Sequence, residues 1–183
     1  MPADEPDAAD PWRRELAEIY RAHADFVLRC AGHLGVRDDG KDDVVHDVFL
    51  VAHRRLPDFD VSRGSLRSWL YGITRRVVMH HQRNDARRAR KLRAVPRPHD
   101  PIAPDEQIAQ RRAADEVQAF LASLPEERRL VFALADIEGM SVVEVARALD
   151  TNLNTVYGRL RTARSAFAAW VRRLEEEGDD VRR

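Results

Sequence analysis

The sequence has little of what a secreted, disulfide-bonded or membrane-spanning protein needs. Cys30 is the only cysteine among 183 residues, which excludes an internal disulfide and a cysteine-based metal site and suits a reducing cytoplasm. The N-terminal residues are acidic and poor in apolar side chains, unlike a secretory signal. The longest apolar runs, such as residues 48–52, are far too short to span a bilayer. We therefore expect a cytoplasmic protein that does not insert into membranes.

Enzymatic signatures are missing too. The chain has no Gly-rich phosphate loop and no nucleophile motif. A histidine metal site is the remaining catalytic alternative, but His46 and His53 are two helical turns apart, too far to chelate one ion directly. His80 and His81 are adjacent on an expected helix and so point in different directions. We expect no enzymatic activity, no cofactor and no metal, and a measurement of bound metal tests this.

The chain has no net charge, with 31 basic and 31 acidic residues, but the two signs are segregated along it. Between residues 63 and 97 basic side chains are frequent and Asp85 is the only acid. Between residues 100 and 127 acids dominate, and both ends of the chain are acidic. Because a polyanion responds to local fields rather than to net charge, the basic segments stay candidates for nucleic-acid binding.

No strand pattern and no repeat of solenoid period is present, which predicts an all-α fold. Four prolines lie within residues 94–104 and exclude a helix there. We expect two small helical domains, residues 10–93 and 105–174, joined by 94–104 as a Pro-rich linker.

In the first domain, apolar periodicity predicts three helices, at about 11–33, 41–56 and 66–92. Asp10 and Pro11 form a good start for the first helix. Pro57 ends the second, and Ser65 is placed to cap the third.

In the second domain, a helix is expected over about 105–121. Ser123 and Glu126 have the spacing of a capping box, which predicts a further helix reaching Glu138. Gly139 is the natural C-cap of that helix.

The segment 141–170 carries the most informative pattern. Ser141 and Glu144 predict a second capping box, followed by a short helix, a polar turn and another helix from about Leu153. Helical spacing predicts that one face of this last helix is buried: Val156, Leu160, Ala163, Phe167 and Val171. Residues 153–170 include arginines but no acid, which favours a helix-turn-helix for the major groove over a surface hairpin with solvated arginines.

Two blocks carry a resemblance to a known family. The first is DDVVHDVFLVAHRRLPDFDVSRGSLRSWLYGIT, and the second is LASLPEERRLVFALADIEGMSVVEVARALDTNLNTVYGRLRTARSAF. They are similar to regions 2 and 4 of a group IV, or extracytoplasmic-function (ECF), bacterial sigma factor, in the family's order and spacing. The resemblance covers about residues 11–173. It implies a protein that binds core RNA polymerase, directs it to promoters and helps to open the duplex.

A stand-alone helix-turn-helix regulator that binds duplex DNA without core polymerase is the alternative. The first block speaks against it, because such a regulator has no need of the W-L-Y-x-I helix. The resemblance also implies the partners: the β′ and β subunits of core polymerase, promoter DNA and, as is common in the family, an anti-sigma factor.

The resemblance assigns the polymerase contact to the polar side of the second helix: Asp42, Asp43, His46 and Asp47. His46 and Asp47 stand where the family usually has Gln and Glu. A plain solvated face is the alternative for this cluster, and a carboxylate metal site lacks a closed ligand set.

The resemblance implies that the promoter −10 element meets the third helix and the loop 58–64, which is similar to the family's base-selecting loop. Capturing a flipped base from melted DNA needs a cationic groove with aromatic or polar walls. The expected contacts are Asp58, Phe59, Asp60, Arg63, Arg67, Tyr71, Arg75, Arg76, Arg83 and Arg87. Trp69 is expected to pack rather than to stack on a base. Arg76 stands where the family commonly has Asn.

The −35 element is expected to meet the last helix, through Asn154, Thr155, Tyr157, Gly158, Arg159, Arg161, Thr162 and Arg164. Gly158 is unusual inside a helix, where it costs about 1 kcal/mol relative to Ala. Close approach to DNA would explain it, and so would drift.

Overall fold

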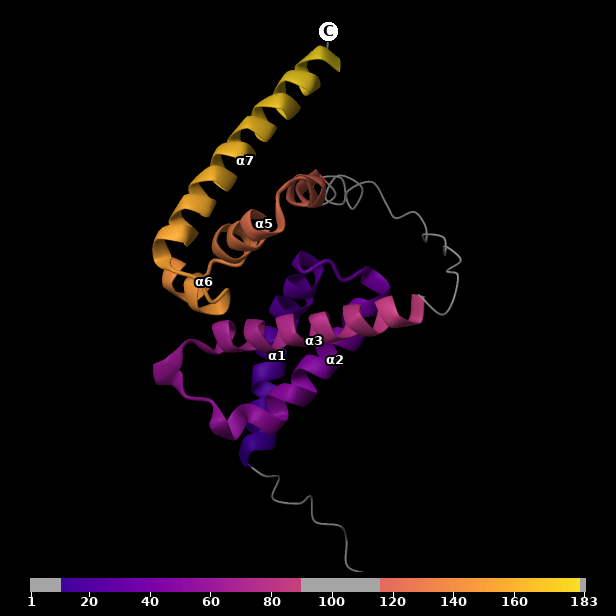
Figure 1. Ribbon diagram of the computed structural model, residues 1–183, viewed down its shortest axis with the longest axis vertical. Coiled ribbons are helices and arrows are strands. Elements are labelled where there is room, and N and C mark those ends of the chain that lie inside the picture. Colours follow the sequence, from indigo (N-terminus) through magenta and orange to yellow (C-terminus); the bar gives the residue numbers. More distant parts are fainter. Residues whose placement is uncertain (1–10, 90–115, 182–183) are drawn as a thin grey trace, which may run out of the picture. The chain divides into compact units, whose positions relative to one another are not determined.

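The computed structural model describes residues 11–89 and 116–181, and every regular element in these ranges is helical (Figure 1). The elements are, in chain order, α1 (Pro11–His33), α2 (Asp38–Arg55), the 3-10 turns η1 (Leu56–Asp58) and η2 (Val61–Arg63), α3 (Leu66–Ala89), a helix over 116–123, α5 (Glu126–Phe132), the π-turn η3 (Ala133–Ile137), α6 (Val142–Ala148) and α7 (Leu153–Val181). The predicted all-α fold is confirmed. Within the described ranges, no helix combines the length and apolarity that crossing a bilayer requires.

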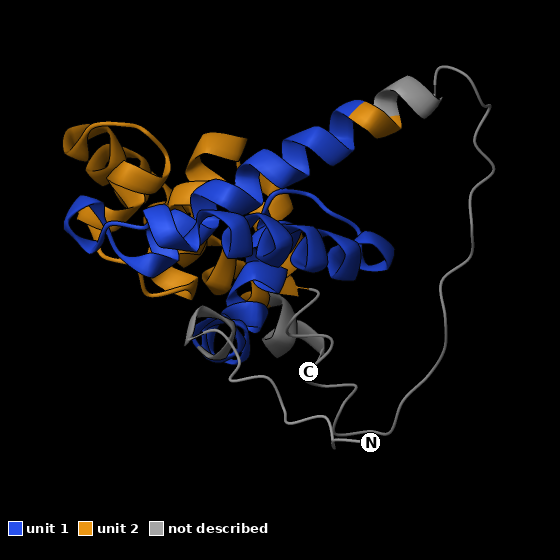
Figure 2. Ribbon diagram, turned by 90° about the horizontal axis from the view of Figure 1, so that it is seen from below, with its two compact units in different colours: residues 1–83 blue, residues 84–183 orange. Residues whose placement is uncertain are grey.

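The chain divides into two compact units, Met1–Arg83 and Asn84–Arg183, which are coloured separately in Figure 2. The Asp10 cap, the linker 94–104 and the start of the expected helix at 105 lie outside the described residues. The predicted domain limits therefore stay a prediction.

Each of α1, α2 and α3 buries one side in the core of the first unit. Phe26 from α1, Val48 from α2 and Leu70 from α3 are all buried. The Tyr20 ring on α1 meets the Phe49 ring on α2 edge-on, with centroids 4.7 Å apart. This packing leaves the loop between α2 and α3 outside the core, where it can contact a ligand.

The helix ends in the first unit follow local chemistry. α2 begins at Asp38, earlier than expected, and two carboxylates occupy its first turn, where they stabilise the positive end of the helix dipole. Lys41 lies 2.6 Å from Asp38 one turn on. Ser65 caps α3 as predicted, because its Oγ accepts a hydrogen bond from the Ser68 amide at 3.2 Å.

An aromatic cluster holds the second unit together. The Phe120 ring, from the helix over 116–123, lies 5.5 Å from the ring of Phe132 on α5. It also lies 5.2 Å from Phe167 and 5.4 Å from Trp170, both on α7. Offset and edge-on ring pairs of this kind add to the free energy gained by burial. The cluster therefore ties three helices of this unit to one another.

The predicted capping box of Ser123 and Glu126 is wrong. Ser123 lies at the end of the preceding helix, and its hydroxyl donates back to the Phe120 carbonyl at 2.6 Å. Pro125 is the N-cap residue of α5, and no side chain caps that helix. The hydroxyl was already in use one turn earlier, which the local spacing could not reveal.

The helix expected to reach Glu138 changes character before its end. α5 passes into the π-turn Ala133–Ile137, where the Glu138 amide donates to the Ala133 carbonyl at 2.8 Å. Gly139 follows with φ +66°, the left-handed conformation of a helix C-cap, as predicted. A π-turn places one extra residue in the turn and so re-aims the side chains that follow.

Truncating the ring at the centre of the aromatic cluster tests how the second unit is held. Phe120 is 2% exposed, so Phe120→Ala leaves a cavity between three helices. We expect a loss of about 3–5 kcal/mol in the free energy of unfolding, measured by chemical denaturation. The matched control is Tyr157→Ala, because that ring is 58% exposed and its loss should cost less than about 1 kcal/mol. Equal losses for the two variants would contradict the assignment.

Candidate nucleic-acid and polymerase interfaces

Hydrogen bonds cap the start of α6 and the start of α7 on either side of the helix-turn-helix. The predicted capping box at the start of α6 is present: Ser141 donates its amide to Glu144 Oε2 at 2.8 Å, and the Glu144 amide donates to Ser141 Oγ at 3.3 Å. Asp150 adopts a left-handed φ of 51° in the turn. Asn152 Oδ1 then accepts from the Thr155 amide at 2.8 Å and caps α7. These bonds fix the angle at which α7 leaves the turn.

The rotation of α7 about its axis follows from its apolar side. Val156, Leu160 and Ala163 are buried, as predicted, while Phe167 and Val171 are half-buried. Most of the side chains expected to face a −35 element lie on the other side and are exposed: Asn154, Tyr157, Arg161, Thr162 and Arg164. Thr155, Gly158 and Arg159 are half-buried. The helix thus has an apolar back and a polar front, which is what major-groove binding requires.

Two of the predicted base-reading arginines form ion pairs with the element before the helix-turn-helix. Arg159 donates to Glu127 at the start of α5. Arg164 donates from Nε and from one terminal nitrogen to the two oxygens of Asp136, at 2.9 and 2.6 Å. This bidentate hydrogen bonding raises the pKa of Arg164 above its usual value. Asp136 lies in the π-turn, so the carboxylate that binds Arg164 is placed by the segment in which the helix changes its geometry.

No close contact within the second unit requires a glycine at position 158. A Cβ built at this position meets no atom within 4 Å. The Thr162 hydroxyl donates to the Gly158 carbonyl at 3.0 Å, so it bonds back to its own helix. The surface around Gly158 forms a shallow hollow with Asn154, Tyr157 and Arg161. A ligand backbone or groove wall can therefore approach α7 most closely here.

The loop expected to select a −10 base is organised by its own side chains. Asp60 Oδ1 accepts from the Ser62 amide at 2.9 Å and from the Ser62 hydroxyl at 2.6 Å, which caps the η2 turn. These bonds, with a smaller contribution from Arg63, lower the pKa of Asp60. The Phe59 ring rests on Trp69 with centroids 5.1 Å apart. Trp69 therefore packs against the loop, as expected.

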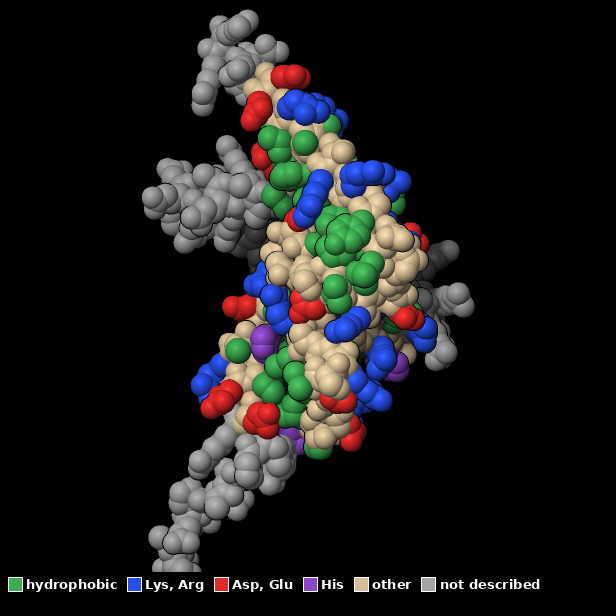
Figure 3. Space-filling view, turned by 90° about the vertical axis from the view of Figure 1, so that its left-hand side faces the viewer, with side chains coloured by type: hydrophobic (Ala, Val, Ile, Leu, Met, Phe, Trp, Pro, Cys, Tyr) green, Lys and Arg blue, Asp and Glu red, His purple; other side chains and the backbone are tan. Residues whose placement is uncertain are grey.

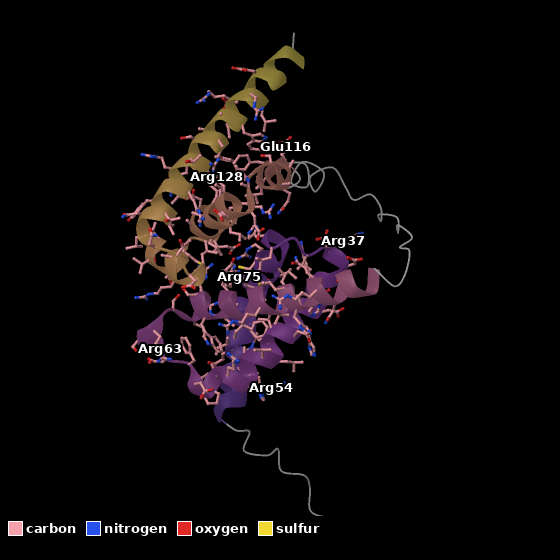
Figure 4. The ribbon with its side chains drawn as sticks, viewed as in Figure 1. Arg37, Arg54, Arg63, Arg75, Glu116 and Arg128 are labelled. Atoms are coloured by element: carbon pink, nitrogen blue, oxygen red, sulfur yellow. The ribbon has the colours of Figure 1, made fainter. Side chains whose placement is uncertain are left out.

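The rest of this predicted site divides into exposed and covered groups. Asp58 and Arg63 are exposed on the loop. Arg75, Arg76 and Arg83 are exposed on α3. Figure 4 labels Arg63 on the loop and Arg75 on α3, on separate parts of the unit. The side chain of Arg87 lies outside the described residues.

The expected stripe of Arg67, Tyr71 and Arg75 is not one surface. Tyr71 is 0% exposed and belongs to the core, so its ring is not a wall for a DNA base. Arg67 is half-buried, with its guanidinium 4.4 Å from the centre of the Phe26 ring on α1. Residues spaced by four drift about 40° per step around a helix, so Tyr71 still falls within the buried arc of α3 whereas Arg75, one step further, falls outside it.

The predicted polymerase-binding cluster is largely on the surface of α2. Asp42, Asp43 and His46 are exposed. Asp47 is half-buried and its Oδ2 lies 2.7 Å from Nε2 of His81 on α3. Asp47 thus also fixes α3 on α2, which separates it in role from the three exposed residues.

Sequence reasoning missed an apolar hollow beside this cluster. Leu50, Val51 and Val77 line it together with Arg54 and Asp47, from α2 and α3. Leu50 is 44% exposed although it is a large apolar residue. The sequence could have indicated this hollow, because Leu50 follows His46 by one helical turn and so lies on the same side of α2. A partner helix that meets the acidic cluster can also bury apolar side chains here.

The histidines considered as metal ligands do not gather. Among the residues that the structure describes, no group of three His, Cys, Asp or Glu side chains could hold a metal ion. His46 and His80 are exposed, and His53 is half-buried.

Comparison with known proteins gives the same two-part organisation. The family model of sigma-70 region 2 matches residues 19–88, and that of sigma-70 region 4 matches residues 114–167. The RNA polymerase sigma factor CnrH of Cupriavidus metallidurans is 30% identical over 176 residues, which cover 88% of this chain and 89% of the relative. The ECF RNA polymerase sigma factor SigE of Mycolicibacterium smegmatis is 29% identical over 87% of this chain, and the match spans 63% of the length of SigE.

A solved structure agrees with these relatives. CnrH in complex with the cytosolic domain of CnrY superposes with a TM-score of 0.64 at 28% identity. The match covers 87% of this chain and 88% of that chain.

Replacing Gly158 tests whether α7 is approached closely by DNA. We expect Gly158→Ala to raise the free energy of unfolding by about 1 kcal/mol, because alanine favours the helix and its Cβ meets no atom. We expect the same change to weaken binding to duplexes selected from a random library by the wild-type protein, measured by fluorescence anisotropy. Gly72→Ala makes the same change inside α3, where an added Cβ also meets no atom within 4 Å, and it is the control. A gain in stability with unchanged binding would leave Gly158 without a part in DNA contact.

Proposed function

Because the chain belongs to the sigma-70 family of RNA polymerase sigma factors, in its extracytoplasmic-function group, we propose that α7 reads the −35 element of promoters while α2 binds core polymerase. Sigma factors perform no chemistry of their own, and they act by bringing polymerase to a promoter. The observation that carries the proposal is the amphipathic arrangement of α7: Val156 and Leu160 are buried while Asn154, Tyr157 and Arg161 are exposed beyond a capped turn.

The first unit supports the other half of the proposal. The α2 surface offers Asp42, Asp43 and His46 to a basic partner surface, with the hollow around Leu50 beside them. The exposed arginines of α3, namely Arg75, Arg76 and Arg83, offer positive charge suited to melted −10 DNA, and Arg63 adds one more on the loop 58–64. A stand-alone regulator is not favoured, because sigma-70 region 2 matches residues 19–88.

An anti-sigma factor is part of the same proposal. CnrH was solved in complex with the cytosolic domain of CnrY, and its chain is similar to this one over most of the length of both. The apolar hollow on α2 and α3 is a surface that such a protein can cover. Because a sigma factor acts where the chromosome and the polymerase are, the proposal includes a cytoplasmic location for this chain.

Run-off transcription tests the function directly. The full chain is added to bacterial core RNA polymerase on a library of promoter fragments from a GC-rich genome. We expect transcripts that depend on the chain, and roughly a tenfold or greater loss of them with Arg161→Ala, because an arginine at a base edge or phosphate is removed. Arg172→Ala, further along α7, is the matched control and should transcribe normally. Binding to DNA without any binding to core polymerase would instead support a stand-alone regulator.

The α2 contact has its own test. We expect Asp43→Arg to weaken binding to core polymerase by about tenfold or more, because a reversed charge meets a partner surface of the same sign. Binding is measured by competition with a labelled wild-type chain. Asp25→Arg makes the same charge change on the exposed surface of α1 in the same unit. If both variants bind equally well, the solvated-face interpretation of Asp42, Asp43 and His46 is correct.

A further inference from the structure

The positive charge of the exposed side of α7 is partly neutralised by carboxylates of its own unit. Residues 153–170 contain no acid, yet two of the three arginines in this stretch are paired with carboxylates from α5 and η3. Arg159 has a side chain only 27% exposed and pairs with Glu127. Arg164 is held by both oxygens of Asp136. On the face drawn in Figure 3, basic and acidic side chains are interspersed and do not form one continuous basic patch.

Arg161 differs from these two. It is exposed between them in sequence, and it has no ion pair among the described residues. The helix thus presents one arginine that is ready for DNA and two whose charge is already partly satisfied. An ion pair to Glu127 or Asp136 must be loosened before Arg159 or Arg164 can neutralise a phosphate.

We propose that Glu127 and Asp136 are internal counter-ions of the recognition helix, which limit DNA binding without sequence preference and so raise the selectivity of the −35 contact. This proposal rests on the proposed role of α7. Non-specific binding comes from releasing counterions at phosphates, and an arginine already paired with a carboxylate gains little by moving to a phosphate. A bidentate contact with a guanine edge adds hydrogen bonds that replace those given up. Selectivity then comes from weakening the wrong complexes more than the right one.

Glu127→Gln is the central variant, because this carboxylate is 69% exposed and its removal leaves the core intact. Glu126→Gln is the matched control, since it removes the same charge from the same turn of α5. Binding of the full chain to a duplex of random sequence is measured by anisotropy from low salt upward. For Glu127→Gln we expect binding to tighten by about three- to fivefold. The slope of log affinity against log salt concentration should steepen by about 0.9, the value for one more phosphate contact.

A double-mutant cycle separates the pair from a general effect of charge. In an Arg159→Ala background, Glu127→Gln should no longer tighten binding, whereas any small effect of Glu126→Gln should persist. Asp136→Asn should act in the same direction through Arg164, with melting temperatures recorded to exclude unfolding. Selection from a random duplex library, followed by sequencing, should show weaker enrichment of any one sequence by Glu127→Gln than by wild type.

The outcomes that overturn the proposal are distinct from those that overturn the function. If Glu127→Gln binds random DNA no better than Glu126→Gln, or binds it more weakly, the acids are not counter-ions that limit binding. If Arg161→Ala also leaves DNA binding unchanged, then α7 is not the DNA contact and the proposed function of the helix fails. If Arg161→Ala loses binding while Glu127→Gln and Glu126→Gln have equal effects, only the counter-ion proposal fails and the proposed function of α7 stands.

Discussion

Burial of the apolar side of α7 against its neighbours is the contact on which the second unit depends. Val156, Leu160 and Ala163 are at most 3% exposed, and α7 packs on both α5 and α6. Because each residue turns a helix by 100°, fixing this side fixes the direction of every other side chain. The same contact therefore supplies the stability of the unit and the choice of side chains, such as Arg161, that face outward. A change in the core of this unit would rotate its binding surface as well as weaken its fold.

The helices themselves could be predicted from the sequence, because periodicity and caps are local. The Ser141 capping box, the start of α7 at Leu153 and the Gly139 C-cap all follow from neighbouring residues. The width of a buried face is not local. Tyr71 was expected at the surface, but α3 contacts α1 through Arg67 and α2 through His81, and its buried arc is wide enough to include Tyr71. A stripe drawn from spacing alone cannot reveal how many helices will cover it.

Pairs formed across the fold were equally hidden. His81 and Asp47 are 34 residues apart, and Arg159 and Glu127 are 32 apart. Nothing in the local pattern marks either residue as half of a pair, since an exposed arginine and a paired one look alike in sequence. The candidate site could thus be located by motif, while the electrostatic state of its members depended on the tertiary structure. Ser123 shows the same limit at short range, because its hydroxyl was taken by the Phe120 carbonyl.

Three acidic side chains beside the expected DNA surfaces are each held by a hydrogen-bond donor. Asp60 is bound by Ser62, and Glu127 and Asp136 by arginines. The lowered pKa of Asp60 means that its cap is fully formed above the usual pKa of an aspartate and is lost only as the pH falls through the lowered value. At neutral pH the loop 58–64 therefore keeps its shape and a fixed negative charge. Such a charge repels phosphates at Asp60. A DNA strand is therefore expected to run along Arg63 and the exposed arginines of α3 and to avoid the capped η2 turn.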